Sequence, residues 1–134
     1  MSIEDNKALV SRLYDLLGRK QFDAAYKYFD IVFVFHSSAG DLSLEQMKQL
    51  DRDFYSAFPD IEVNVEDMVA GDDKVSVRVN YRGTHLAAFI GISPTGRRID
   101  ITNANTLRIK AGKFVEGWNV TDIRLMQQLG AIPS

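Results

Sequence analysis

The sequence contains no cysteine, only two histidines and three prolines, and no long apolar run. Without cysteine there is no disulfide, no thiol nucleophile and no cysteine-ligated metal, which fits a reducing cytosol. No stretch approaches the ~18 apolar residues that a membrane span requires. The acidic start MSIEDNKALV has no features of a signal peptide. We therefore expect a cytoplasmic protein that does not associate with a membrane.

An excess of positive charge is also missing. The 16 lysines and arginines are outnumbered by 18 acidic residues, which leaves a net charge of −2. Such a chain does not neutralise a phosphate backbone, so we expect no nucleic-acid partner. Its 46% of hydrophobic and 25% of charged residues are typical of a globular protein. A length of 134 residues suits one domain, which we expect to span residues 1–134.

Several common catalytic motifs are absent as well. The sequence has no GxSxG, no P-loop and no GxGxxG, which removes support for a serine hydrolase, a nucleotide hydrolase or a dinucleotide-binding fold. The two histidines have no carboxylates at metal-ligand spacing, and neither HExxH nor a facial triad is present. We therefore expect no metal site.

The first half of the sequence has helical periodicity. Ser2 with Asp5 predicts the cap of a helix whose apolar stripe runs from Leu9 to Leu17. Ser43 with Gln46 forms a capping box for another helix. That helix is expected to bury Leu44, Met47, Leu50, Phe54 and Phe58. A short helix, FDAAYKYF, and a strand, IVFVF, separate the two. The continuous apolar run predicts that this strand is buried.

After Pro59 the period changes to two, and four strands linked by turns or a loop are predicted: IEVNVEDMV, VSVRVNYRG, RRIDITNANTLRIK and FVEGWNVTD. In the first of them Val65, Asp67 and Val69 share one parity, so Asp67 is a candidate to point inward. Helices followed by strands of this kind predict an α+β domain with helices on one face of an antiparallel sheet. Because long twisted strands curl and three helices cannot fill the concave side, a pocket between helices and sheet is expected.

The strand RRIDITNANTLRIK carries two amides on an otherwise apolar face. Asn103 and Asn105 alternate with the apolar residues Ile99, Ile101 and Leu107. A buried amide costs free energy unless it is hydrogen-bonded. Either these side chains pin a bulge or a loop end, or they line a cavity and hold a ligand oxygen.

Three further residues are candidates for chemistry. His36 ends the apolar strand and titrates near neutrality, so it is either an acid/base group or a structural histidine. Asn119 is a third amide in a half-apolar strand, next to Trp118, which we expect to pack with Phe114 and Val120. Asp122 ends this strand, and the following IRLMQQL favours a helix cap over a catalytic role.

Several elements together resemble the SnoaL-like polyketide cyclase family, also called ester cyclases. They are FPD, the R-x-x-x-x-GTH element from Arg78 to His85, the PTG segment within Gly91 to Arg97, the G-K-x-x-E-x-W strand and the QQLG tail. The resemblance covers roughly positions 36 to 130. It implies a nuclear-transport-factor-2-like fold, a cone of helices against a strongly curved antiparallel sheet that encloses a deep apolar pocket. It also implies homodimers or tetramers, of which we expect a homodimer here, and no metal or organic cofactor.

The same resemblance exposes two departures. Characterised cyclases close a ring by intramolecular aldol condensation, with an aspartate directly after the strand tryptophan as acid/base. That position is Asn119 here, and a histidine of the neighbouring strand is replaced by Asn105. An amide can donate to an enolate oxygen but cannot abstract a carbon-bound proton. The aldol mechanism therefore does not transfer unchanged, and His36, which matches a frequent family histidine, ranks first as a replacement base.

Three functions remain open from the sequence. The first is a pocket protein for a small apolar molecule with a carbonyl group, with His36, Asn105 and Asn119 as catalytic candidates. Its ligand contacts are expected to be Asn103, Tyr14, Phe54, Tyr55 and Asp122. The second is a non-catalytic binding or dimerisation domain, and the third a cofactor-free hydroxylase or isomerase. A closed cavity of about 300 Å³ or more beside both amides favours ligand binding. Bulky side chains in that space favour assembly.

Overall fold

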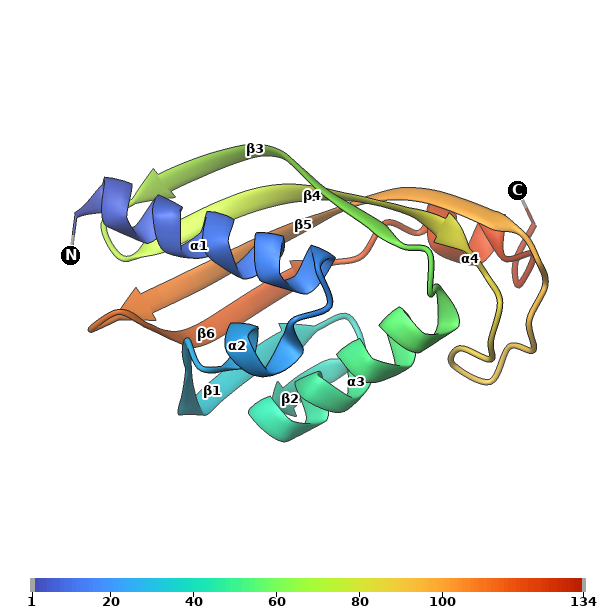
Figure 1. Cartoon of the computed structure of the whole chain (residues 1–134), viewed down its shortest axis with the longest axis horizontal. Coiled ribbons are helices and arrows are strands. Elements are labelled where there is room, and N and C mark those ends of the chain that lie inside the picture. Colours follow the sequence, from blue (N-terminus) through green and yellow to red (C-terminus); the bar gives the residue numbers. More distant parts are fainter. Residues whose placement is uncertain (1, 134) are drawn as a thin grey trace.

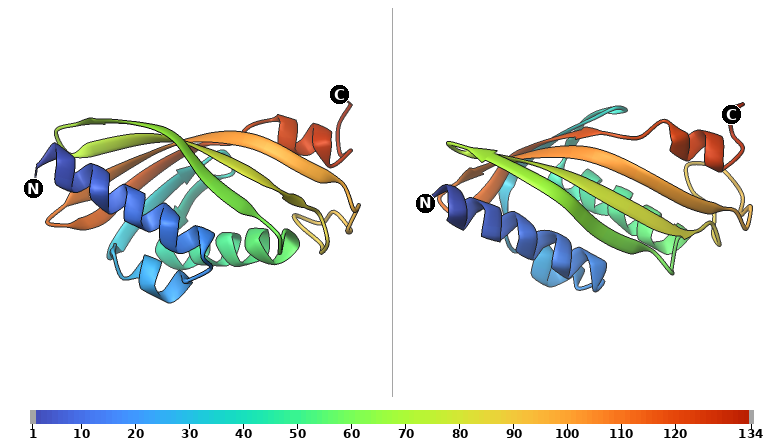
Figure 2. Two further views of the ribbon diagram at one scale, coloured as in Figure 1. Left: turned by 45° about the horizontal axis from the view of Figure 1, so that its top comes forward. Right: turned by 90° about the horizontal axis from the view of Figure 1, so that it is seen from above.

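The computed structural model describes residues 2–133 (Figure 1). The helices are α1 (Ile3–Gly18), α2 (Phe22–Tyr26), α3 (Leu44–Ala57) and α4 (Arg124–Gln128). The strands are β1 (Phe29–Ser37), β2 (Gly40–Ser43), β3 (Glu62–Gly71), β4 (Lys74–Thr84), β5 (Arg98–Lys110) and β6 (Lys113–Val120). Helices α1, α2 and α3 cover one face of the sheet, and α4 lies near the C-terminus (Figures 1 and 2). We call the covered face the inner face and the opposite one the outer face.

Both long helices begin where their sequence predicts. The Asp5 N–H donates to Ser2 Oγ at 3.0 Å, and the Ser2 N–H donates to the Asp5 carboxylate at 3.2 Å. Ser43 and Gln46 form the same reciprocal pair at the start of α3. These bonds satisfy N–H groups that the first helical turn leaves without partners. They fix the start of the two helices whose apolar stripes face the sheet.

The sheet has the strand order β2-β1-β6-β5-β4-β3. Strands β3 to β6 pair antiparallel in sequence order, and β1 pairs antiparallel with β2. The pair β1–β6 is parallel, because the chain returns to β1 only after crossing α3 and the β3–β5 strands. The α+β class with helices on one face is confirmed, and the sheet is mixed and open rather than wholly antiparallel.

A bulge in β3 changes which of its residues face inward. Val65 pairs with Val79, but Asp67 pairs with Arg78, so one residue is inserted between them. After this point Met68 packs against the core, whereas Val69 is 71% exposed. Asp67 lies on the outer face, where it accepts two hydrogen bonds at 2.9 Å from the Arg78 guanidinium. The expectation that Asp67 could point inward is therefore wrong.

Strand β6 contains a similar irregularity. Ile109 of β5 pairs with Phe114, whereas Arg108 pairs with Glu116, so the alternation shifts by one residue. Phe114 is fully buried, whereas the ring of Trp118 stacks on His36 of the outer face, although Trp118 also borders the inner cavity. The prediction that Trp118 packs on the same face as Phe114 is wrong for this reason. The shift also directs Asn119 to the inner face.

Strand β1 is not buried on both faces, contrary to the reading of IVFVF as a buried strand. Phe33 is 2% exposed, whereas Ile31 is 88% and Val32 68% exposed. The reason is that helices cover only the inner face. The outer face of β1 therefore presents apolar side chains to solvent. Within residues 2–133, no helix is both long enough and apolar enough to cross a membrane.

Candidate functional site

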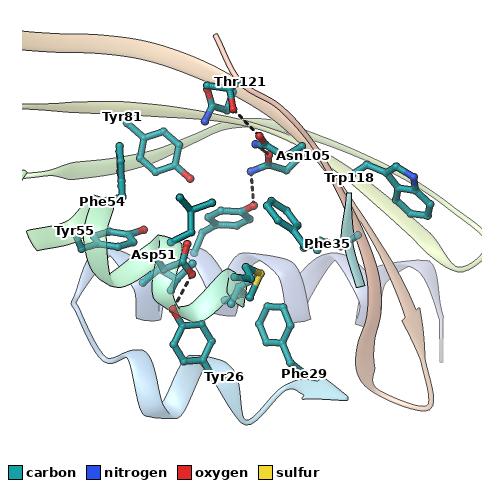
Figure 3. Close-up of a pocket in the computed structure, with 18 of the residues that line it drawn as sticks. Tyr26, Phe29, Phe35, Asp51, Phe54, Tyr55, Tyr81, Asn105, Trp118 and Thr121 are labelled. Carbon is teal, nitrogen blue, oxygen red and sulfur yellow. Dashed lines mark hydrogen bonds between the residues drawn. The ribbon is translucent and has the colours of Figure 1, made fainter. Parts of the chain in front are cut away.

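A cavity of about 190 Å³ lies between the inner face of the sheet and helices α1, α2 and α3 (Figure 3). Its walls are largely aromatic and aliphatic. The polar or ionisable side chains that line it are Tyr14, Tyr26, Asp51, Tyr55, Tyr81, Asn103, Asn105, Asn119 and Thr121. The predicted contacts Phe54 and Tyr55 also line it. The cavity is smaller than the roughly 300–1,000 Å³ of pockets that hold drug-sized ligands. It is nevertheless open space next to both amides.

Asn105 and Asn119 are direct neighbours across the β5–β6 pair. The Asn119 side-chain N–H donates to Asn105 Oδ1 at 2.5 Å, and the Thr121 hydroxyl donates to Asn119 Oδ1 at 2.6 Å. Opposed residues of an antiparallel pair point to the same face, which is why the two amides meet. The family resemblance predicts that both amides line the pocket as neighbours, and the structure brings them together.

The chain of hydrogen bonds ends at Tyr14 of α1. The second polar atom of Asn105, its Nδ2, donates to the Tyr14 hydroxyl at 2.8 Å (Figure 3). Burial raises the pKa of Tyr14 well above its ordinary value, so the phenol stays protonated. Among residues 2–133 no group accepts the Tyr14 proton, although its oxygen already accepts a bond. The hydroxyl is therefore a free donor inside the cavity.

Asn103 and Asp122 hold the end of β5 against the segment after β6. The Asp122 N–H donates to Asn103 Oδ1 at 2.9 Å, so this amide lines the cavity and also pins the chain. The Asp122 carboxylate accepts from the Thr102 N–H at 3.1 Å and from the Arg124 side chain. The Arg124 bonds lower the pKa of Asp122 to about 2. Asp122 does not line the cavity, so its predicted ligand contact is not supported by the geometry.

His36 lies on the outer face of the sheet, not in the cavity. Its Nδ1 is 2.7 Å from Asp41 Oδ1 and its Nε2 is 2.6 Å from Glu116 Oε2. The ring stacks on Trp118 with 5.4 Å between centroids. These two carboxylates raise the pKa of His36 above its ordinary value. The expectation that His36 faces the pocket is wrong, because alternation along β1 directs Phe33 and Phe35 inward and His36 outward.

Asp51 of α3 lines the cavity and was not among the residues predicted from the sequence. Its Oδ2 accepts a hydrogen bond from the Tyr26 hydroxyl at 2.7 Å (Figure 3). Burial raises the pKa of Asp51 to about 6. A signal was present, since Asp51 lies one turn after Met47 and one turn before Tyr55, both buried. A carboxylate on the apolar stripe of a helix is uncommon enough to be a site candidate.

The second histidine, His85, has a structural role and does not form a second site. His85 is fully buried, its Nδ1 is 2.9 Å from the Thr95 hydroxyl, and its ring packs against Phe58. It is a core histidine that fixes the loop before β5. In the part of the chain that the structure describes, no three or more His, Asp or Glu side chains gather as a metal site would require.

Comparison with solved structures identifies close relatives of this fold. AclR from Streptomyces galilaeus, a proposed hydroxylase, has a TM-score of 0.92 at 31% identity, and the match covers 98% of this chain and 100% of that one. IdmH from Streptomyces antibioticus, a proposed polyketide cyclase, has a TM-score of 0.81 at 26% identity, covering 95% and 99%. A proposed SnoaL-like cyclase from Jannaschia sp. CCS1 shares the fold at 23% identity, with a TM-score of 0.89 over 99% and 97%. No curated protein matches the sequence.

The sequence itself matches the SnoaL-like polyketide cyclase family over residues 7–129, almost the whole chain. The matched region contains most of α1, all of α2 and α3, the six strands of the described chain and the residues that line the cavity. With the structural matches, this shows that the protein belongs to the SnoaL-like polyketide cyclase family and has its nuclear-transport-factor-2-like fold.

Proposed function

We propose that the cavity binds a small, mostly apolar molecule that carries a carbonyl group. The observation that carries this proposal is the free Tyr14 proton at the end of a hydrogen-bond chain in an otherwise apolar space. A carbonyl oxygen accepts such a donor, and a largely apolar skeleton fits the aromatic walls. The volume of about 190 Å³ favours a ligand of one or two rings.

The hydrogen bonds from Thr121 to Tyr14 all donate in the same direction, which leaves a donor at the end for a carbonyl oxygen. Thr121 donates to Asn119, Asn119 to Asn105, and Asn105 to Tyr14. Each bond polarises the next, so the terminal Tyr14 hydroxyl becomes a stronger donor than an isolated phenol. Negative charge that develops on a bound carbonyl oxygen is stabilised by a preorganised donor of this kind. The same group therefore serves binding and the stabilisation of an enolate.

A cyclase or isomerase reaction needs a base as well as this donor. Neither Asn105 nor Asn119 can take a carbon-bound proton, so the two amides orient and stabilise while another group abstracts the proton. The family and the proposed cyclase activity of IdmH support this reading. The proposed hydroxylase activity of AclR, at 31% identity, favours a second candidate, a cofactor-free hydroxylase that uses the same cavity.

We also propose that a second copy of this chain covers the outer face. Val32, Val34 and Val120 are 68%, 36% and 67% exposed, a cost that an interface would remove. Nearby side chains carry both signs of charge, namely Arg108, Lys110 and Lys113 against Asp30, Asp41 and Glu116. A twofold interface places a patch against itself, so mixed charges can pair across it. A domain that dimerises without binding a ligand is the alternative.

The binding proposal is tested by a ligand screen on the wild type and two matched variants. Native mass spectrometry or thermal shift with a set of one- and two-ring ketones and esters should yield binders. Tyr14→Phe should weaken their binding about two- to tenfold, because one neutral hydrogen bond contributes roughly 0.5–1.5 kcal/mol. Tyr28→Phe removes a hydroxyl that lies outside the cavity lining, and this variant should bind nearly as the wild type. Equal affinity in all three proteins would contradict the role of Tyr14.

The assembly proposal is tested separately by sedimentation. Val32→Lys should convert a dimer to monomers, whereas Leu86→Lys, at a 54% exposed position in the loop after β4, should not. A wild type that sediments as a monomer at every concentration tested would refute it.

A further inference from the structure

Among the described residues that line the cavity, Asp51 has the only charged side chain. No lysine, arginine or histidine of residues 2–133 belongs to the lining, and the neighbouring Arg52, outside the lining, lowers the pKa of Asp51 less than burial raises it. A structural buried carboxylate is usually paired with a cation or held by several donors. Here a single side chain, Tyr26, donates to it.

The bond from Tyr26 leaves half of the carboxylate free. The phenol donates to Asp51 Oδ2, and no side chain or backbone group of residues 2–133 donates to Oδ1. A carboxylate that is oriented at one oxygen and open at the other is suited to exchange a proton with a bound molecule. Tyr26 itself is oriented by an edge contact with Phe29, at 6.0 Å between centroids.

Asp51 and the polar chain belong to different walls of the same cavity. Asp51 is on α3, whereas Asn105 and Asn119 are on the sheet and Tyr14 reaches them from α1. Figure 3 shows Asp51 and Asn105 on opposite sides of the space between helix and sheet. A molecule whose carbonyl oxygen rests on Tyr14 therefore presents its neighbouring carbon atoms toward the helix side. Such an arrangement separates the base from the oxyanion donor, as enolisation requires.

We propose that Asp51 is the acid/base residue of this cavity, acting on a carbon acid whose carbonyl oxygen is held by Tyr14; this rests on the ligand proposed above. The Asp51 carboxylate removes a proton from the carbon next to the carbonyl. The electrons of that C–H bond form the C=C bond of an enolate, and the carbonyl π electrons move to the oxygen, which Tyr14 stabilises.

The second half-reaction returns the proton. In an isomerisation, the Asp51 carboxyl protonates a different carbon of the same extended enolate. In a cyclisation, the enolate carbon attacks a second carbonyl of the molecule, and the new alkoxide takes the proton from Asp51. In both reactions the atoms and electrons balance without an oxidant, a reductant or a metal. A pKa of about 6 leaves Asp51 ionised at neutral pH and more basic than an ordinary aspartate.

The test uses 2-tetralone, a two-ring ketone with acidic C–H bonds, in D₂O. Exchange of its α hydrogens is followed by mass spectrometry, and its binding by native mass spectrometry. The wild type should accelerate exchange over buffer, with a rate that rises through pH 6 and then levels off. Asp51→Asn should reduce the enzymatic rate at least a hundredfold, the lower range for general acid/base catalysis, while 2-tetralone still binds. Asp53→Asn, an exposed carboxylate of the same helix, should leave the rate unchanged.

A second variant separates chemistry from positioning. Tyr26→Phe keeps the carboxylate but removes its orienting bond, so the rate should fall less than in Asp51→Asn and the pH at half-maximal rate should shift. If the wild type binds 2-tetralone and exchange is not accelerated, or if Asp51→Asn exchanges as fast as the wild type, the role of Asp51 is refuted and the binding function stands. If neither 2-tetralone nor any ketone of the screen binds, both proposals fall.

Discussion

Replacing Asp51 by asparagine should make the folded protein more stable at neutral pH but not in acid. The ordinary pKa of an aspartate is 3.8, and burial raises that of Asp51 to about 6. Each pKa unit corresponds to about 1.4 kcal/mol, so ionising Asp51 costs the folded state on the order of 3 kcal/mol. The amide is nearly isosteric and keeps an oxygen that accepts from Tyr26. It carries no charge, so it avoids this cost.

The direction in which the unfolding free energy changes with pH follows from proton binding. Between about pH 4 and pH 6 the folded state retains a proton that the unfolded chain has released, so the free energy of unfolding falls as pH rises through this window. Above pH 6 the loss is complete and constant. Asp51→Asn has no such loss. The difference in unfolding free energy between variant and wild type should therefore grow by about 2–3 kcal/mol from pH 4 to pH 8.

Urea unfolding followed by circular dichroism at several pH values measures this difference. Any fixed change in packing or in the Tyr26 bond cancels when the same pair of proteins is compared across pH. Asp53→Asn provides the control, since Asp53 is exposed on α3 and accepts only from the Gln49 side chain. Its substitution should shift stability by less than about 0.5 kcal/mol. Parallel stability curves for Asp51→Asn and wild type would show that Asp51 is not held as a destabilised carboxylate.

Two further predictions concern the sheet. Asp41 and Glu116 raise the pKa of His36 in the folded state. The stability that protonated His36 contributes is therefore present below its ordinary pKa of 6.5 and is lost as pH rises through the higher folded value. NMR titration of the wild type should show that higher pKa, and His36→Gln should flatten the dependence of the unfolding free energy on pH above 6.5. A Cβ added at Gly117 would lie 2.9 Å from Phe33, so Gly117→Ala should lower the unfolding free energy by about 1–3 kcal/mol in urea, whereas Gly71→Ala, with nothing within 4 Å, should be close to neutral.

The parts of the fold that could be predicted are those set by local rules. Capping boxes at Ser2 and Ser43 predicted the starts of both long helices because side chain and backbone there satisfy each other within four residues. Alternation in β5 put Asn103 and Asn105 on one face, and this also held. Family resemblance then identified Asn105 and Asn119 as neighbours. Each of these inferences needs only sequence spacing or a matched motif.

The errors come from features that spacing does not encode. One inserted residue in β3 and one in β6 invert the alternation, which sent Asp67 outward and separated Trp118 from Phe114. His36 was assigned to the pocket by resemblance, although strand parity with Phe33 and Phe35 directs it to the outer face. Asp51 is not predictable from the sequence for another reason. The periodicity of its helix identifies only the apolar stripe, and a single carboxylate on that stripe becomes significant only because a cavity lies beside it.

The paired amides also explain why two positions differ together from the cyclases that the sequence resembles. Asn119 donates to Asn105, which leaves Asn105 free to donate to Tyr14. An aspartate at 119 is an acceptor, so Asn105 would turn its N–H toward it and its oxygen toward Tyr14. The phenol would then donate to Asn105, and its proton would no longer be available to hydrogen-bond the ligand. Asn119→Asp alone should therefore weaken ketone binding about as much as Tyr14→Phe.

A protonated histidine at 105 donates from both ring nitrogens, one to an aspartate at 119 and one to Tyr14. The double change Asn105→His with Asn119→Asp should therefore restore the direction of the Tyr14 hydroxyl and recover the binding that the single change loses. Titration of 2-tetralone into the four proteins, including Asn105→His alone, measures this coupling as a double-mutant cycle. Additive effects would mean that the two positions act independently and that the direction of the hydrogen-bond chain does not control the donor. A positive coupling would show that the amide pair and the histidine–aspartate pair present the same proton to the cavity, and that the two differ in which wall supplies the base.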